Sequence, residues 1–146
     1  MGTKRIIHVV GTGTIGEPLI GLLLHVRQAL AVDEITFYKH SPRVMDRAKI
    51  ATLIRRGAKL AVAPERLVEF EKLGIQPTYT TEEALAQATV VIDCTSEGLG
   101  NKHKRDCYTH LPADGCIAQG SEFGFGKMYA HGINDAALVP GEDRFL

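Results

Sequence analysis

The sequence predicts an α/β fold in which a doubly wound parallel sheet lies between two layers of helices. Short segments rich in β-branched residues alternate along the chain with longer segments of helical periodicity. This alternation is typical of βαβ units, whose parallel strands are covered by helices on both faces. The chain has 146 residues, of which 45% are hydrophobic and 23% charged, as in an ordinary globular domain. We therefore expect one three-layer α/β/α domain over residues 1–146.

The expected elements follow from hydrophobic pattern and from helix start and stop signals. Strands are expected at 6–10, 34–38, 60–63, 89–93 and 116–118, and 136–139 could form a further strand. Helices are expected at about 16–26, 42–56, 65–73, 81–88 and 102–110. Ser41 followed by Pro42 is typical of a helix start, and Thr80 with Glu83 has the spacing of a capping box.

Composition narrows the classes of partner. Lys and Arg total 17 and Asp and Glu total 17, so the net charge is zero and neither nucleic acid nor a membrane surface is an expected partner. The apolar runs are too short to span a bilayer, and the first residues lead directly into an expected core strand rather than a signal peptide. Three cysteines without a C-x-x-C pair favour reduced thiols. We expect a cytoplasmic protein.

A glycine-rich turn follows the first expected strand. It reads GTGTIG over residues 11–16 and opens an amphipathic helix, the context of a Rossmann-like dinucleotide site. In such a site the first glycine allows the tight turn, the second lets the backbone approach a pyrophosphate, and the third allows close packing of the helix. The alternative is a strand-to-helix turn that binds nothing. The expected cofactor contacts in this turn are Gly11, Gly13, Thr14, Ile15 and Gly16.

The end of the second strand bears on the choice between NADP and NAD. An NAD site usually carries a carboxylate there, but Asp33 and Glu34 come before the strand. Lys39, Ser41 and Arg43 follow it instead, and these side chains suit a 2′-phosphate. The alternative is a solvated basic turn. The sequence therefore favours NADP over NAD.

Further polar groups follow the strand at 89–93. Thr95 and Ser96 could donate hydrogen bonds to the ribose or phosphates of the cofactor, or could cap the next helix. The aromatic loop 124–126 could cover the nicotinamide or could be an ordinary turn.

Three potential metal ligands are spaced along one predicted helix. His103, Cys107 and His110 would share one face of an expected helix, but no fourth ligand is evident, and we expect no metal.

The turn at 11–16 is similar to the opening of glyceraldehyde-3-phosphate dehydrogenases, in particular the archaeal-type (type II) enzymes. The resemblance continues in the same order through 56–60, 70–75, 90–93 and 118–122. It implies that Gln119 and Gly120 also lie at the cofactor. It departs from the archaeal pattern at 94–97, where the hydroxyl-rich loop is closer to that of bacterial enzymes.

The resemblance also implies that cofactor binding and catalysis are carried by two different domains. Enzymes of this family oxidise an aldehyde with NADP or NAD through a cysteine thiolate in a second domain. None of the three cysteines here lies in such a motif, so no catalytic residue is assigned. We expect a cofactor-binding domain that is inactive alone and compatible with a homo-oligomer. The alternatives are a stand-alone NADP-binding regulatory or scaffold module, and the cofactor domain of a semialdehyde or dihydrodipicolinate reductase-type enzyme.

Overall fold

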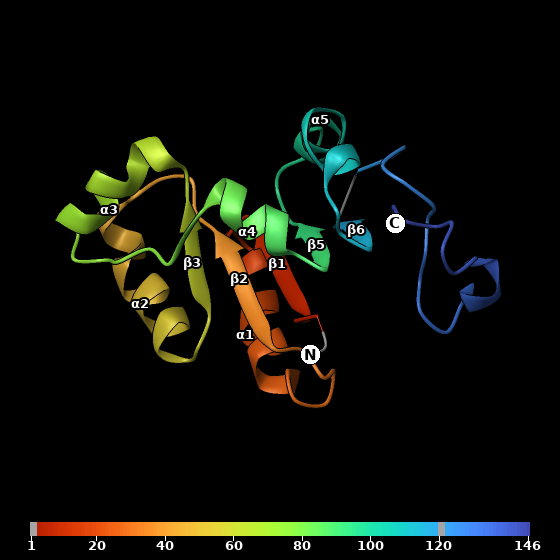
Figure 1. Cartoon of the computed structure of the whole chain (residues 1–146), viewed down its shortest axis with the longest axis horizontal. Helices are drawn as coiled ribbons and strands as arrows, with labels where there is room; N and C mark the ends of the chain where they lie inside the picture. The colour runs from red at the N-terminus through yellow and green to blue at the C-terminus, as the bar shows by residue number, and fades with distance from the viewer. Residues whose placement is uncertain (1–2, 120–121) are drawn as a thin grey trace.

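The centre of the molecule is a six-stranded sheet whose strands are all parallel (Figure 1). The structure is a computed structural model that describes residues 3–119 and 122–146. The strand order is β4-β3-β2-β1-β5-β6, which confirms the doubly wound prediction. The strands are β1 (Ile6–Val10), β2 (Glu34–Tyr38), β3 (Lys59–Val62), β4 (Tyr79–Thr80), β5 (Val90–Asp93) and β6 (Gly115–Ala118).

Helices cover both faces of this sheet. They are α1 (Gly16–Val26), α2 (Arg47–Arg55), α3 (Leu67–Lys72), α4 (Thr81–Gln87) and α5 (Leu99–Asp106). On one face, Ile20 of α1 and Leu53 of α2 pack into a core with Phe37. On the other face, Leu85 of α4 shares a second core with Val91 of β5. Side chains alternate between the faces along each strand, so every strand contributes to two hydrophobic layers.

Several helix boundaries were predicted correctly from local signals. Thr80 and Glu83 form the capping box, with the backbone N–H of Glu83 donating to the Thr80 hydroxyl at 3.2 Å. Gly74 follows α3 with φ +70°, a conformation that glycine adopts without strain.

Other boundaries differ from the prediction. Ser41 does not cap a helix, because a 3₁₀ turn (Val44–Asp46) intervenes and α2 begins at Arg47 without a side-chain cap. The helix expected to reach residue 110 ends at Asp106, and a separate 3₁₀ turn (Tyr108–His110) follows.

The prediction that 136–139 could form a strand is also wrong. A 3₁₀ turn (Asp135–Ala137) lies there, and polar side chains hold it. The carboxylate of Asp135 accepts hydrogen bonds from the Gly132 N–H and the Tyr129 hydroxyl. These local bonds compete with strand formation, as short polar side chains often do in turns.

The strand order creates a topological switch point between β1 and β5. The chain moves outward from β1 through β2, β3 and β4, then returns through α4 to β5 on the other side of β1. Val10 at the end of β1 is paired with both Tyr38 and Asp93, so the three strands end at the same edge. Ligands of doubly wound sheets bind outside this edge at the switch point.

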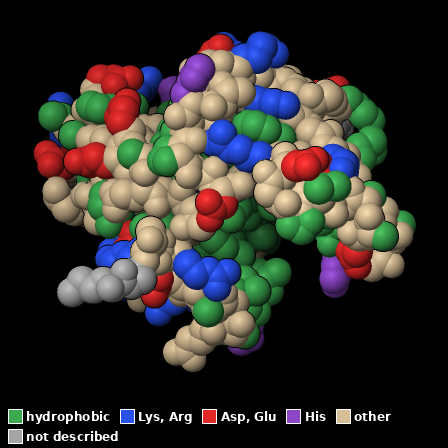
Figure 2. All heavy atoms as spheres, turned by 45° about the vertical axis from the view of Figure 1, so that its right-hand side comes forward, with side chains coloured by type: hydrophobic (Ala, Val, Ile, Leu, Met, Phe, Trp, Pro, Cys, Tyr) green, Lys and Arg blue, Asp and Glu red, His purple; other side chains and the backbone are tan. Residues whose placement is uncertain are grey.

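Basic and acidic side chains are interspersed on the face that Figure 2 shows. Among the helices of residues 3–119 and 122–146, none has the length and apolar character needed to cross a membrane.

Candidate functional site

Two glycines fit the turn after β1 tightly onto the first turn of α1. Gly11 has φ +101°, and a Cβ there would lie 3.1 Å from the Cys94 carbonyl oxygen. A Cβ on Gly16 would lie 2.0 Å from the carbonyl oxygen of Gly11. Both positions therefore require glycine, one because of its backbone conformation and the other because of the close approach of α1.

The remaining glycine of the turn has a different environment. No heavy atom lies within 4 Å of a Cβ built on Gly13, and Gly13 and Thr14 are exposed. Ile15, at the N-cap of α1, makes no side-chain capping bond and is 48% exposed. In the first turn of α1 the N–H of Glu17 donates to the Gly13 carbonyl oxygen at 3.2 Å and Pro18 has no N–H. An anion at this helix start would therefore meet the N–H groups before Glu17 and the partial positive charge of the helix. This turn is therefore the candidate position for the pyrophosphate of a dinucleotide.

The loop after β5 lies beside this turn and is organised by Asp93, which is 1% exposed. Its Oδ1 accepts hydrogen bonds from the Thr95 N–H at 2.9 Å and from the Thr95 hydroxyl at 2.5 Å. Its Oδ2 accepts from His103 Nδ1 at 2.8 Å and from the Tyr108 hydroxyl at 2.6 Å. One buried carboxylate thus connects the end of β5 to α5 and the 3₁₀ turn that follows it.

These bonds determine which form of Asp93 is present. Burial alone would raise the pKa of Asp93, but hydrogen bonds from His103, Thr95 and Tyr108 outweigh it and hold the pKa below its ordinary value. Burial, with the charge of Asp93, raises the pKa of Tyr108 far above its usual range. Asp93 is therefore an ionised acceptor and Tyr108 a neutral donor at neutral pH.

The helix-capping alternative for Thr95 and Ser96 is wrong. The N-cap of α5 is Gly98, in a left-handed conformation, and it makes no side-chain capping bond. The carboxylate of Glu122 accepts hydrogen bonds from the N–H groups of Gly100 and Asn101 instead. No local pattern could reveal this cap, because Glu122 is more than twenty residues along the chain from the helix start.

The basic group after β2 lies next to the glycine turn but is already paired. Lys39 Nζ lies 2.7 Å from a carboxylate oxygen of Asp46, and both side chains line a small cavity with Thr12. Arg43 is exposed, and its N–H donates to the carbonyl oxygen of Ser41 at 3.0 Å. A 2′-phosphate reaching Lys39 would therefore compete with Asp46, whose carboxylate comes from the turn before α2.

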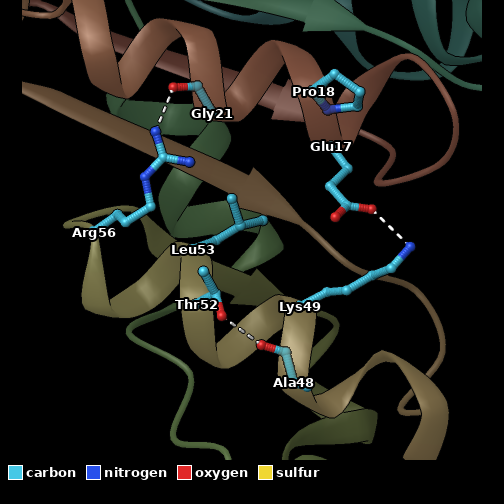
Figure 3. A pocket seen from close by; sticks show the side chains of 8 residues that line it. All are labelled: Glu17, Pro18, Gly21, Ala48, Lys49, Thr52, Leu53 and Arg56. Carbon is cyan, nitrogen blue, oxygen red and sulfur yellow. Dashed lines mark hydrogen bonds and ion pairs between the residues drawn. The ribbon is translucent and has the colours of Figure 1, made fainter.

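A groove of about 560 Å³ separates α1 from α2 on the outer surface. Figure 3 shows Lys49 of α2 reaching Glu17 of α1, with 2.9 Å between Nζ and Oε2. Further along, Arg56 donates to the carbonyl oxygen of Gly21 at 2.8 Å. These two contacts join the helices across the groove.

The remaining residues that were predicted to contact the cofactor lie at or beyond the end of β6 in the sequence. The N–H of Gln119 donates to the Asp93 carbonyl oxygen at 2.9 Å, which extends the β5–β6 pairing to the edge of the site. Gly120 lies outside the described residues. Phe125 is 1% exposed and packs edge-on against Tyr108 and Phe145, so it is part of the core and does not cover a cofactor.

The cysteines and histidines of the chain are not arranged as a reactive or metal-binding group. Because α5 ends at Asp106, His103, Cys107 and His110 do not share one continuous helix. Within 3–119 and 122–146, no three His, Cys, Asp or Glu side chains come together as metal ligands. Burial raises the pKa of Cys94 and of Cys116 to about 11, so both are neutral thiols.

The fold and the turn define a Rossmann-like doubly wound domain, and comparison with known proteins adds a relationship. No protein-family model matches the sequence. The chain is 34% identical over 106 residues to glyceraldehyde-3-phosphate dehydrogenase of Methanobacterium formicicum. The aligned residues make up 72% of this chain and 29% of that protein. The corresponding enzyme of Methanobacterium bryantii is 32% identical over 117 residues, covering 80% and 32%. That of Pyrobaculum arsenaticum is 27% identical over 116 residues, covering 80% and 31%.

These similarities support a relationship to the archaeal glyceraldehyde-3-phosphate dehydrogenases. The chain spans about a third of the length of these relatives.

Proposed function

We propose that residues 1–146 form a dinucleotide-binding domain and that its ligand lies across the switch point between β1 and β5. The observation that carries this proposal is the glycine turn. Gly16 seats α1 against the carbonyl of Gly11, while Gly13 and the uncapped helix start stay open. Together they make a cradle for a pyrophosphate at a helix N-terminus. A bound nicotinamide dinucleotide would supply the hydride chemistry, and these residues would hold its pyrophosphate.

We further propose that the domain serves an oxidoreductase of the archaeal, type II glyceraldehyde-3-phosphate dehydrogenase kind. The curated relatives support this assignment. A cysteine-dependent aldehyde oxidation needs a thiolate, but burial raises the pKa of all three thiols of this chain. The pKa is about 11 for Cys94 and for Cys116, and that of Cys107 also lies above its ordinary value. The nucleophile would therefore come from other residues, and the 146-residue chain alone should show no turnover with glyceraldehyde 3-phosphate.

NADP is the proposed cofactor, with Asp46 limiting its advantage over NAD. Lys39 and Arg43 supply positive charge at the end of β2, but Lys39 is held by Asp46 at 2.7 Å. Removing that carboxylate would leave the ammonium group of Lys39 to the 2′-phosphate. Ser41 is placed in the same turn and could add a hydroxyl donor.

Calorimetric titration of the 146-residue protein with NADP and with NAD tests these points. We expect both to bind, with NADP tighter. Asp46→Asn should tighten NADP binding roughly threefold to tenfold, the effect of one gained charge-assisted hydrogen bond, and leave NAD nearly unchanged.

Asp106→Asn is the matched control, since Asp106 pairs with Lys102 on the surface of α5, away from the turn. A wild-type preference for NAD would overturn the NADP assignment. Failure to bind either dinucleotide would overturn the domain assignment, and turnover by the 146 residues would refute the need for an outside nucleophile.

A further inference from the structure

We propose that Thr95 contacts a sugar hydroxyl of the bound dinucleotide as a hydrogen-bond acceptor only, a role that Asp93 imposes on it. This inference rests on the proposed dinucleotide site and assigns one of its contacts. It differs from the expectation that Thr95 donates to the ligand. A threonine hydroxyl can act in either direction, so the direction has to come from its surroundings.

The surroundings of Thr95 use up both of its hydrogen-bond donors. Its N–H lies 2.9 Å and its hydroxyl oxygen 2.5 Å from the same oxygen of Asp93. An ionised carboxylate has no hydrogen to donate, so the hydrogen in the second bond belongs to Thr95. The hydroxyl oxygen then has only lone pairs left for a ligand.

Asp93 cannot easily release Thr95, because its other oxygen is held as well. Oδ2 accepts from His103 Nδ1 at 2.8 Å and from the Tyr108 hydroxyl at 2.6 Å. The carboxylate is 1% exposed, and rotating it would leave buried donors without partners. Asp93 is thus a positioning residue for Thr95.

Thr95 lies beside the turn that fits the pyrophosphate. Its backbone nitrogen is 3.4 Å from the position of a Cβ on Gly11, and the residue is only partly buried. Phosphate oxygens are acceptors and carry negative charge, so they are disfavoured next to a hydroxyl whose hydrogen already points at Asp93. A ribose hydroxyl can donate, so it fits this oxygen. We therefore assign the phosphates of the ligand to the start of α1 and a ribose to Thr95.

Chemical and protein substitutions together test the contact. The probes are NADP and NADP analogues that lack one ribose hydroxyl each, titrated into wild type, Thr95→Val and Thr95→Ser. Thr95→Val keeps the shape and the N–H but removes the hydroxyl, and should weaken NADP binding about threefold to tenfold. Thr95→Ser should restore most of the affinity.

One deoxy analogue should bind wild type more weakly than NADP by a similar factor, yet bind Thr95→Val as well as NADP does. A general loosening of the loop would weaken every ligand equally and would not produce this pattern. Thr109→Val, at an exposed threonine after α5, is the control and should bind like wild type. Thermal unfolding of each variant checks that the fold is kept.

Several outcomes would overturn the proposal. They are NADP affinity unchanged in Thr95→Val, an equal loss for every analogue in both proteins, and no recovery in Thr95→Ser. A wild type that binds no dinucleotide would instead overturn the proposed function, so the two failures are distinguishable.

Discussion

At the scale of single residues, His8 is a buried histidine in the middle of β1. It is 0% exposed, and its Nδ1 lies 2.7 Å from the hydroxyl of Thr36 on β2. Its Nε2 has no hydrogen-bond partner among the residues that the structure describes. His8 also lines a cavity of about 550 Å³ between α4 and the segment after α5. Burial lowers the pKa of His8 to about 4, so the ring is neutral in the folded protein at neutral pH.

This residue predicts an acid-sensitive fold. Between pH 6.5 and about 4 the unfolded chain binds a proton at His8 and the folded chain does not. The free energy of unfolding should therefore fall as the pH falls through this window, by about 3 kcal/mol in total from this group. Urea unfolding at pH 7 and at pH 4.5 measures the difference.

His8→Gln, which keeps a polar group for Thr36, should reduce that difference by most of this amount. His25→Gln, at an exposed histidine of α1, should leave it as in wild type. An undiminished pH dependence in His8→Gln would contradict the prediction. Asp93 contributes little to the difference, because its pKa lies below its ordinary value and it stays ionised over this range.

At the scale of elements, α1 is held against the turn after β1 by the contact between Gly16 and Gly11. Gly16→Ala would place a methyl group 2.0 Å from a backbone oxygen, which flexible side chains cannot relieve. We expect about 1–3 kcal/mol of destabilisation, in the range of overpacked cores, together with weaker dinucleotide binding. Urea unfolding and calorimetric titration measure the two effects.

Gly13→Ala separates binding from stability at the same turn. Nothing lies within 4 Å of the added methyl group, so the free energy of unfolding should change by less than about 1 kcal/mol. The methyl group would nevertheless occupy space that the pyrophosphate needs, and affinity should fall. Unchanged affinity in Gly13→Ala would argue against a pyrophosphate at this position.

Local signals predict most of the elements and little of the contacts between them. The five longer strands, the capping box at Thr80 and the glycine turn were predicted correctly, because each is determined by residues close together in sequence. The two-residue strand β4 was not predicted, because it is too short to show a hydrophobic pattern of its own. The cap that Glu122 supplies to α5 and the pairing of Lys39 with Asp46 were missed, because loop geometry brings these groups together. The role of Asp93 was missed too, since a carboxylate that ends a strand does not reveal its donors.

At the scale of the whole molecule, the C-terminal segment 122–146 loops away from the sheet and returns with its end beside β6, where Phe145 forms a single parallel bridge with Cys116 (Figure 1). The N–H of Cys116 donates to the Arg144 carbonyl oxygen at 2.8 Å, and the N–H of Leu146 donates to the Cys116 carbonyl oxygen at 3.0 Å. Phe145 packs edge-on against Phe125, so the segment also contributes to the second hydrophobic core. Residues that are far apart in sequence thus cover the outer edge of β6.

Arg144 anchors this segment to the residues between α5 and β6. Its guanidinium group donates to the carbonyl oxygens of Ala113 at 3.0 Å and Tyr108 at 3.2 Å, and also to that of Leu111. Arg144→Met would keep the apolar part of the side chain and leave these acceptors without a charged donor. We expect the free energy of unfolding in urea to fall by about 2 kcal/mol or more.

A lysine at position 144 should not restore the stabilising contacts of the arginine. A single ammonium group cannot reproduce the planar fork that reaches several carbonyls, so Arg144→Lys should recover less than half of the loss. Arg105→Met, at an exposed arginine of α5, is the control and should change the free energy of unfolding by no more than about 0.5 kcal/mol. Since Tyr108 also donates to Asp93, loosening the Arg144 contact should also disturb the loop after β5. We expect weaker NADP binding in Arg144→Met and unchanged binding in Arg105→Met, which would show that segment 122–146 supports the proposed site. If Arg144→Met is as stable as wild type, the contacts of Arg144 do not hold this segment in place.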